Sequence, residues 1–163
     1  MPIPGIEQPS FIKIDEGLRL RKYDGAYDFA FDWYQDEDTV YMVDGVRKHY
    51  DMELLTCMYE HLKEQGELYF IEVLQDGRAI PVGDVTFWKE DMPIVIGDRG
   101  YRGRGIAQKV IRCLIQRGRD LGYDCLYVHE IYDFNLASRG CFQSLGFEAY
   151  EKTEKGHRYR VKL

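Results

Sequence analysis

The sequence has few of the features that mark metal-bound, disulfide-linked or membrane proteins. Only four cysteines occur among 163 residues, and no two have the C-x-x-C spacing of a zinc or redox site. We therefore interpret them as small buried side chains. No apolar run approaches the roughly 20 residues that span a bilayer, and the first residues lack the basic and apolar regions of a signal peptide. These absences predict no metal site, no membrane partner and a cytoplasmic location.

The composition predicts a folded protein that does not bind nucleic acid. Hydrophobic residues make up 45% of the chain and charged residues 31%, as in globular proteins. The length suits one domain with a sizeable core, so we assign residues 1–163 to a single domain. The net charge of −6 opposes binding to a polyanion. A monomer and a homodimer are both compatible with the sequence.

Two segments carry charge of one sign only. Residues 24–44 hold seven acidic residues and no Lys or Arg, and residues 99–119 hold seven basic residues and no Asp or Glu. An acidic segment suits a cationic acceptor, and a basic segment suits an anionic cofactor. An ordinary solvated surface is the alternative for both, and for the acidic segment we weigh the two interpretations equally.

The basic segment contains a glycine turn, Arg102-Gly103-Arg104-Gly105-Ile106-Ala107, between a short apolar run and a long amphipathic pattern. Glycine lets a backbone approach a ligand closely. The first N–H groups of a helix have no partner within the helix, and its dipole favours negative charge there. The turn therefore predicts a site for a phosphate or pyrophosphate group.

Hydrophobic periodicity predicts a mixed α/β fold, with a largely antiparallel sheet, flanking helices and one β-α-β crossover. We expect strands at residues 11–15, 18–23, 68–74, 80–88, 93–97, 125–131, 147–152 and 157–161. We expect helices at residues 24–33, 45–64, 103–121 and 135–145. The pair Asp76-Gly77 predicts a two-residue hairpin turn.

Three features together resemble the GNAT superfamily of acyl-CoA-dependent N-acetyltransferases. The turn Arg102–Ala107 fits the R/Q-x-x-G-x-G/A pyrophosphate loop of that family. The family's N-x-x-A/S-x-x-x-Y-x-x-x-G-F helix is matched at Asn135, Ser138, Phe142, Gly146 and Phe147, with Phe142 in place of Tyr. The expected order of elements also matches along nearly the whole chain, so the resemblance implies a GNAT-like acyltransferase fold.

The resemblance implies acetyl-CoA as co-substrate and locates its binding residues. The pyrophosphate would be held by backbone amides of Gly103, Arg104, Gly105, Ile106 and Ala107. The pantetheine arm would pair, like an added β-strand, with Val95, Ile96 and Gly97. Asn135 would contact the pantetheine and also cap its helix, and Ser138 faces the same way one turn later. Candidates for the phosphates are Arg102, Arg104 and Lys109.

The catalytic groups are harder to assign from the sequence. The family's Tyr, which protonates the leaving thiolate, is Phe142 here and has no proton to donate. Tyr132 is a candidate substitute, with a core role as the alternative. The strand at residues 93–97 offers no acid as a general base. Our first candidate is therefore Asp84, for which a structural hydrogen bond is an equal alternative, and the next are Asp98 and Glu130.

The resemblance implies direct transfer of an acetyl group to a primary amine in a ternary complex. No cysteine lies in a nucleophile setting, so we expect no acyl-enzyme. Aromatic residues interleave with the acids of residues 23–41, which predicts a polycationic acceptor, as in the aminoglycoside 6′-N-acetyltransferase branch. The alternatives are a polyamine, a peptide N-terminus or a catalytically silent acyl-CoA-binding module. Phosphoryl transfer is disfavoured because no G-K-[ST] follows the glycines.

Overall fold

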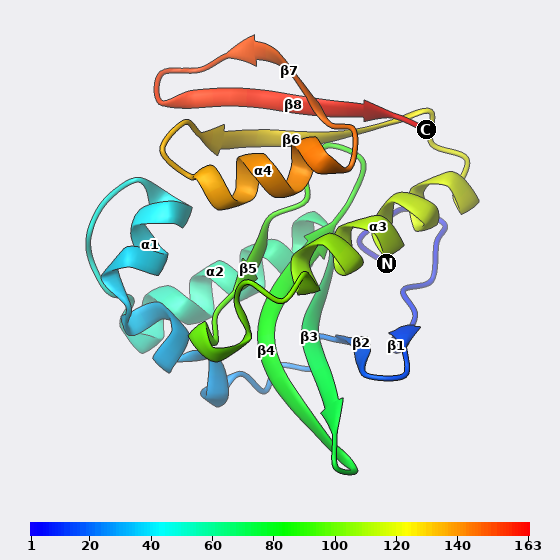
Figure 1. The fold of residues 1–163 in the computed structure, drawn as a ribbon. Helices are drawn as coiled ribbons and strands as arrows, with labels where there is room; N and C mark the ends of the chain where they lie inside the picture. The colour runs from blue at the N-terminus through cyan, green and yellow to red at the C-terminus, as the bar shows by residue number, and fades with distance from the viewer. The chain divides into compact units, whose positions relative to one another are not determined.

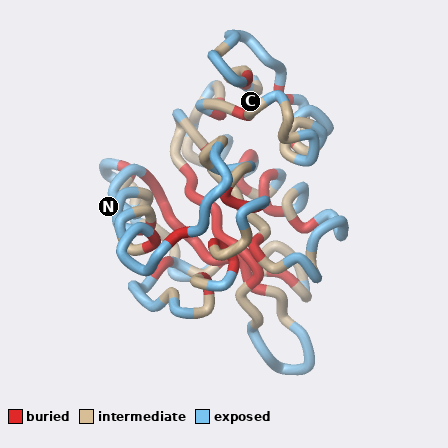
Figure 2. Tube along the Cα trace, turned by 90° about the vertical axis from the view of Figure 1, so that its left-hand side faces the viewer, coloured by how far each residue is buried: buried red, intermediate tan, exposed pale blue.

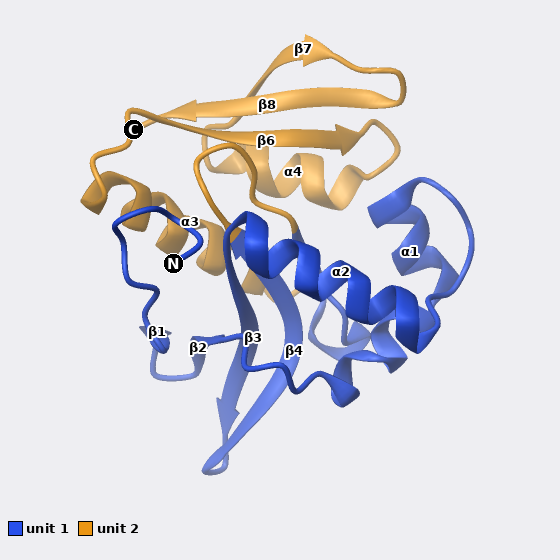
Figure 3. Cartoon of the chain, turned by 180° about the vertical axis from the view of Figure 1, so that it is seen from behind, with its two compact units in different colours: residues 1–86, 94–102 blue, residues 87–93, 103–163 orange.

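Residues 1–163 are all described by the computed structural model, and they fall into two units (Figure 3). Unit 1 comprises Met1–Thr86 and Ile94–Arg102. Unit 2 comprises Phe87–Pro93 and Gly103–Leu163. The glycine turn lies at a boundary, because Arg102 is the last residue of one unit and Gly103 opens a segment of the other.

Unit 1 is built on a five-stranded sheet in the order β1-β2-β3-β4-β5 (Figure 1). Its strands are β1 (Phe11–Asp15), β2 (Leu18–Lys22), β3 (Glu67–Gln75), β4 (Arg78–Phe87) and β5 (Ile94–Ile96). The predicted hairpin between β3 and β4 is confirmed, since Asp76 and Gly77 have φ angles of 53° and 72°. Positive φ at both central residues is the signature of a type I′ turn, whose twist matches that of the strands it joins.

The helices of unit 1 begin later in the chain than the periodicity predicts. The helix expected at residues 24–33 is wrong, because only the short 3₁₀ turns η1 (Asp28–Ala30) and η2 (Asp32–Gln35) form there. Asp24 instead accepts a hydrogen bond from the backbone N–H of Ala26, and Gly25 has a φ of 87°. This local turn competes with a helix.

Two helices, α1 (Glu37–Asp44) and α2 (Met52–Gln65), follow these turns. The side chain of Asp36 caps α1, and that of Asp51 caps α2 by accepting from the N–H of Leu54 at 2.8 Å. Gly45, with a φ of 75°, ends α1. The single helix predicted from residue 45 therefore begins at residue 52.

The core of unit 1 is an aromatic cluster beside the sheet. Its buried members are Tyr23, Ala30, Trp33, Tyr34, Val40, Tyr50, Leu55, Tyr59, Leu68 and Phe70. Burial follows the strands, whereas the tip of the β3–β4 hairpin is exposed (Figure 2). The aromatic residues expected to stack on an acceptor are therefore largely core residues, because each ring gains more from burial than from exposure.

Unit 2 has a three-stranded antiparallel sheet in the order β6-β8-β7. Its strands are β6 (Cys125–Tyr132), β7 (Glu148–Lys152) and β8 (Gly156–Lys162), and its helices are α3 (Ile106–Asp120) and α4 (Leu136–Ser144). The apolar face of α3 buries Val110, Ile111 and Leu114. The prediction of a mixed α/β fold with antiparallel pairing is confirmed, although the strands form two sheets rather than one.

The expectation that the cysteines are buried is wrong, because Cys57 is exposed and Cys113, Cys125 and Cys141 are half-buried. Cys57 lies on α2, whose buried residues are Leu55 and Tyr59 instead. No helix is both long and apolar enough to cross a bilayer.

Candidate active site

The glycine turn has the backbone geometry of an anion site. Gly103 and Gly105 have φ angles of 73° and 77°, in the left-handed region that residues with a Cβ avoid. This explains why α3 begins at Ile106 rather than at residue 103. Gly105 is the N-cap residue and offers no side chain, and the first turn of α3 carries no acidic residue. The amides that open α3 are therefore left without a side-chain acceptor.

Arg102 has protein partners within unit 1. Its guanidinium donates to the carbonyl oxygen of Ile96 at 2.8 Å and to the hydroxyl of Thr39 at 2.9 Å. These bonds connect the end of β5 to α1. Arg102 and Arg104 are both exposed, and contact of either with a cofactor phosphate stays a prediction.

Strand β5 carries the predicted pantetheine-binding residues at the edge of its sheet. It pairs with β4 on one side, where Asp84 lies opposite Val95 and Gly83 opposite Ile96. An edge strand presents unpaired backbone groups that an extended ligand can bind. The carbonyl oxygen of Ile96 already accepts from Arg102, so pairing of an extended ligand with Val95 and Ile96 stays a prediction.

Gly97, just after β5, has a packing role that the sequence does not reveal. A Cβ at this position would lie 2.3 Å from Cγ of Trp33, a distance that requires something to move. The absence of a side chain at Gly97 thus lets the indole of Trp33 lie against the backbone. The residue that explains this glycine is far away in the chain, so no local signal announces it.

Asp84 lies on β4 and is only 3% exposed. Its Oδ2 accepts two hydrogen bonds, each 2.8 Å long, from the phenol hydroxyls of Tyr34 and Tyr59. Burial raises the pKa of Asp84 to about 6, and the two hydrogen bonds limit the rise. The carboxyl is therefore ionised at neutral pH, yet far more basic than an exposed aspartate. The sequence offered Asp84 as a candidate base, which stays a prediction, and did not point to either tyrosine as its partner.

The two alternative bases have structural partners. Asp98 accepts a hydrogen bond from the N–H of Gly100 at 2.9 Å and caps the 3₁₀ turn η3 (Arg99–Tyr101). Glu130, on β6, accepts from the hydroxyl of Thr153 at 2.5 Å. Asp84 therefore differs from both in being buried and in accepting both of its hydrogen bonds from phenol hydroxyls.

The residues of the predicted motif around α4, from Asn135 to Phe147, all lie in unit 2. The side chain of Asn135 accepts from the N–H of Ser138 at 3.2 Å, so its capping role is confirmed. The ring of Tyr132 stacks on Phe134 with 5.2 Å between centroids. Phe142 is buried and packs edge-on against Phe147 at 5.0 Å. The phenylalanine that replaces the expected tyrosine is thus a core residue.

The sequence model for the acetyltransferase (GNAT) family matches residues 27–147, which include parts of both units. The chain belongs to the acetyltransferase (GNAT) family. The match includes the glycine turn, β5, Asp84 and the α4 motif, so each part of the candidate site lies within the GNAT region.

Individual relatives agree with this family. Human N-acetyltransferase 8B is 31% identical over 105 residues, which cover 60% of this chain and 45% of that protein. The chain spans about half the length of the curated relatives it matches. Among solved structures, a GNAT acetyltransferase from Bacillus anthracis is 18% identical, with a TM-score of 0.74 over 93% of this chain and 98% of its own. The aminoglycoside acetyltransferase AAC(6′)-Ib, solved with coenzyme A, is 14% identical, with a TM-score of 0.69 over 89% and 94%.

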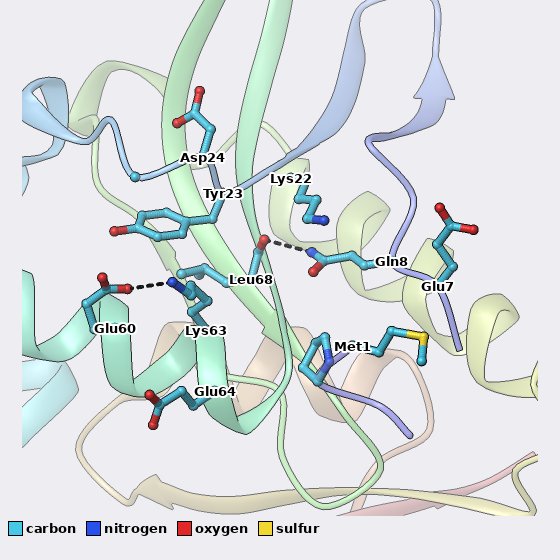
Figure 4. A pocket seen from close by; sticks show the side chains of 12 residues that line it. Met1, Glu7, Gln8, Lys22, Tyr23, Asp24, Glu60, Lys63, Glu64 and Leu68 are labelled. Carbon is cyan, nitrogen blue, oxygen red and sulfur yellow. Dashed lines mark hydrogen bonds and ion pairs between the residues drawn. The ribbon is translucent and has the colours of Figure 1, made fainter. Parts of the chain in front are cut away.

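A cavity of about 610 Å³ lies elsewhere in unit 1 of this GNAT protein (Figure 4). It is lined by residues 1–2, 7–8, 22–25, 60, 63–64 and 68. Lys63 pairs with Glu60 on its wall, and Gln8 donates to the carbonyl oxygen of Leu68 at 3.0 Å. None of the predicted catalytic or cofactor-binding residues lines this cavity, although Tyr23 and Asp24 of the acidic segment do, so we do not equate it with the active site.

Proposed function

We propose that this GNAT protein transfers an acetyl group from acetyl-CoA to a primary amine. The observation that carries the proposal is the glycine turn, whose positive φ angles and uncapped helix amides suit a pyrophosphate, in a chain that belongs to an acetyltransferase family. The pyrophosphate would be held by the amides of residues 103–107, and the pantetheine by the backbone of residues 95–97. Asn135, Ser138 and Arg104 would complete the binding.

In the proposed reaction the neutral amine attacks the thioester carbonyl directly. A C–N bond forms, the C–S bond breaks, and the thiolate of CoA leaves with the electron pair. A backbone N–H near Ile96 would stabilise the negative charge that develops on the carbonyl oxygen. Asp84 would accept the proton that the amine loses, directly or through a water molecule.

The proton for the leaving thiolate needs another source than Phe142. Tyr132 is the candidate that we keep, because its phenol lies in the β6–α4 segment that carries Asn135. Solvent is the alternative, since a thiolate leaves more readily than an amine. Most of the rate gain would come from holding the amine and the thioester together, which requires no covalent intermediate.

For the acceptor we propose an amine with more than one positive charge. With most aromatic rings of residues 23–34 in the core, the support comes from the exposed carboxylates of Asp28, Asp32 and Glu37. Asp36 and Asp38 are less available, because both accept hydrogen bonds from Arg99. Aminoglycosides and polyamines fit this description, and a basic peptide N-terminus is the second candidate.

A thiol-release assay tests the proposal. Acetyl-CoA is offered with aminoglycosides, polyamines, amino acids and basic peptides, and turnover is expected with polycationic amines. Turnover with neutral or acidic amines alone would refute the choice of acceptor. Coenzyme A binding without any turnover would instead indicate a silent binding module, and no binding by calorimetry would refute the whole proposal.

Two variants separate binding from chemistry. Arg104→Ala should chiefly raise the KM for acetyl-CoA, whereas Asp84→Asn should chiefly lower kcat. The reverse pattern would show that these roles are assigned wrongly. Stable label on Cys125 or Cys141 after incubation with labelled acetyl-CoA alone would contradict direct transfer.

A further inference from the structure

The carboxyl of Asp84 is held by two phenols from different elements of unit 1. Tyr34 comes from η2 and Tyr59 from α2, and they are 1% and 0% exposed. Both hydroxyls donate to the same oxygen, Oδ2, at 2.8 Å. No hydrogen bond is present at Oδ1. One oxygen of this buried carboxylate thus accepts two hydrogen bonds, and the other accepts none.

This arrangement is unusual for a buried carboxylate that serves only structure. Burial of a charge is unfavourable unless an opposite charge or a full set of hydrogen bonds compensates for it. Glu72, on β3 of the same sheet, is buried to a similar degree and receives both Arg19 at 2.8 Å and Arg21 at 2.9 Å. Asp84 receives no cation, and both of its hydrogen bonds are accepted by a single oxygen.

We infer that Tyr34 and Tyr59 are positioning residues for Asp84, which hold Oδ2 in place so that Oδ1 accepts the proton of the acceptor amine. The inference rests on the proposed acetyl transfer. As the C–N bond forms, a lone pair of Oδ1 takes the proton from nitrogen, and negative charge passes from the carboxylate to the leaving thiolate. The two phenols keep their protons throughout.

Besides burial, the hydroxyls of Tyr34 and Tyr59 are the groups that shift the pKa of Asp84, so this pKa should depend on the two phenols. On β5 its register partner is Val95, which carries no charge. Tyr50 stacks on Tyr34 with 5.3 Å between ring centroids, but its hydroxyl donates to Asp44 at 2.6 Å. Burial raises the pKa of Asp84 to about 6, and the tyrosine bonds act in the opposite direction.

The test compares Tyr34→Phe and Tyr59→Phe with the matched control Tyr50→Phe. Phenylalanine keeps each ring in the core and removes only the hydroxyl. Loss of one donor to a charged group should move the acidic limb of the kcat–pH profile upward by roughly one to two pH units. Activity should recover at higher pH, and the control profile and the Kd for coenzyme A should be unchanged. A purely structural role would lower activity equally at every pH.

A second measurement does not depend on turnover. The ¹³C carboxyl signal of Asp84 in the free protein should titrate at higher pH in both test variants but not in Tyr50→Phe. If this midpoint moves while the activity profile does not, Asp84 is not the base, and the inference fails although acetyl transfer stands. If neither moves, the tyrosines do not control Asp84.

Failure of the proposed function would look different. Wild-type protein that binds coenzyme A but acetylates no amine would remove the reaction, and with it the catalytic role of the tyrosines, before any variant is made. Each single variant retains one donor, and the near-ultraviolet circular dichroism spectrum reports whether it folds. Should one of them not fold, the other gives the same comparison against Tyr50→Phe.

Discussion

Replacement of Asp84 by Asn should change how the stability of this protein depends on pH. Burial raises the pKa of this carboxyl from its ordinary 3.8 to about 6. Between these values the folded state holds a proton that the unfolded state has lost. The free energy of unfolding therefore falls as pH rises through this window, and the stabilisation is fully present only below the unfolded pKa.

The size of the effect follows from the shift. A difference of about 2.2 pKa units, at about 1.36 kcal/mol per unit, corresponds to about 3 kcal/mol in all, of which about 2.4 kcal/mol is lost between pH 4 and pH 7. Asparagine does not ionise, so its side chain causes no fall in the free energy of unfolding as the pH rises. Relative to wild type, Asp84→Asn should therefore gain about 2.4 kcal/mol of stability as the pH is raised from 4 to 7.

Urea denaturation at several pH values between 4 and 7 measures this difference. Any fixed effect of the new amide on packing is the same at each pH and cancels in the slope. Asp36→Asn is the control of opposite sign. Burial raises the pKa of Asp36, but hydrogen bonds from Arg99 and Thr39 outweigh it and leave the pKa below its ordinary value. Its substitution should be most harmful near neutral pH and less so in acid.

A stability difference between Asp84→Asn and wild type that stays constant from pH 4 to pH 7 would refute the reasoning. It would mean that Asp84 has the same pKa in the folded and unfolded states. The two tyrosine bonds would then offset burial completely, and Asp84 would be an ordinary acid rather than a base suited to neutral pH.

Three further predictions test other parts of the site. Gly105→Ala should weaken coenzyme A binding about tenfold, because a Cβ strains the positive-φ turn that orients the amides. Gly122→Ala, which has a similar positive φ near the other end of α3, should cost similar stability of about 1–2 kcal/mol and leave binding unchanged. Gly97→Ala should lower the free energy of unfolding by about 1–3 kcal/mol, since its methyl group would overlap Trp33. Asn135→Ser should keep the α4 cap and its stability, while Asn135→Ala loses about 1 kcal/mol; a rise in the KM for acetyl-CoA in both would support contact with pantetheine.

The sequence predicts well those elements that short stretches of chain determine. The turn at Asp76-Gly77 forms as expected because glycine and aspartate tolerate positive φ there. The helix expected at residues 24–33 fails because its aromatic spacing reflects burial in a cluster, not a helical face. Caps at Asp36 and Asp51 determine where the helices of unit 1 begin, and such caps outweigh a weak periodic pattern.

The candidate site likewise contains features that depend on a short stretch of chain and contacts between residues far apart in the sequence. The glycine turn is local, so its backbone geometry could be predicted from six consecutive residues, while its role in binding stays a prediction. The partners of Asp84 lie 50 and 25 residues away in the sequence, at Tyr34 and Tyr59, among 13 tyrosines in the chain. Nothing in their local sequence separates them from the other tyrosines. Only the fold brings both hydroxyls to one oxygen of Asp84. The packing of Trp33 against Gly97 likewise joins residues far apart in the sequence.

The cost of Asp84 to stability supports its assignment to function. A buried carboxyl without a cation lowers the free energy of unfolding at neutral pH, whereas an apolar residue of similar size would raise it. Glu72 shows that this sheet can place arginines beside a buried acid. A cation beside Asp84 would stabilise the carboxylate and lower its pKa, and would thereby remove its ability to take a proton from an amine. Two neutral donors instead hold the group in place and leave it basic, as a general base requires.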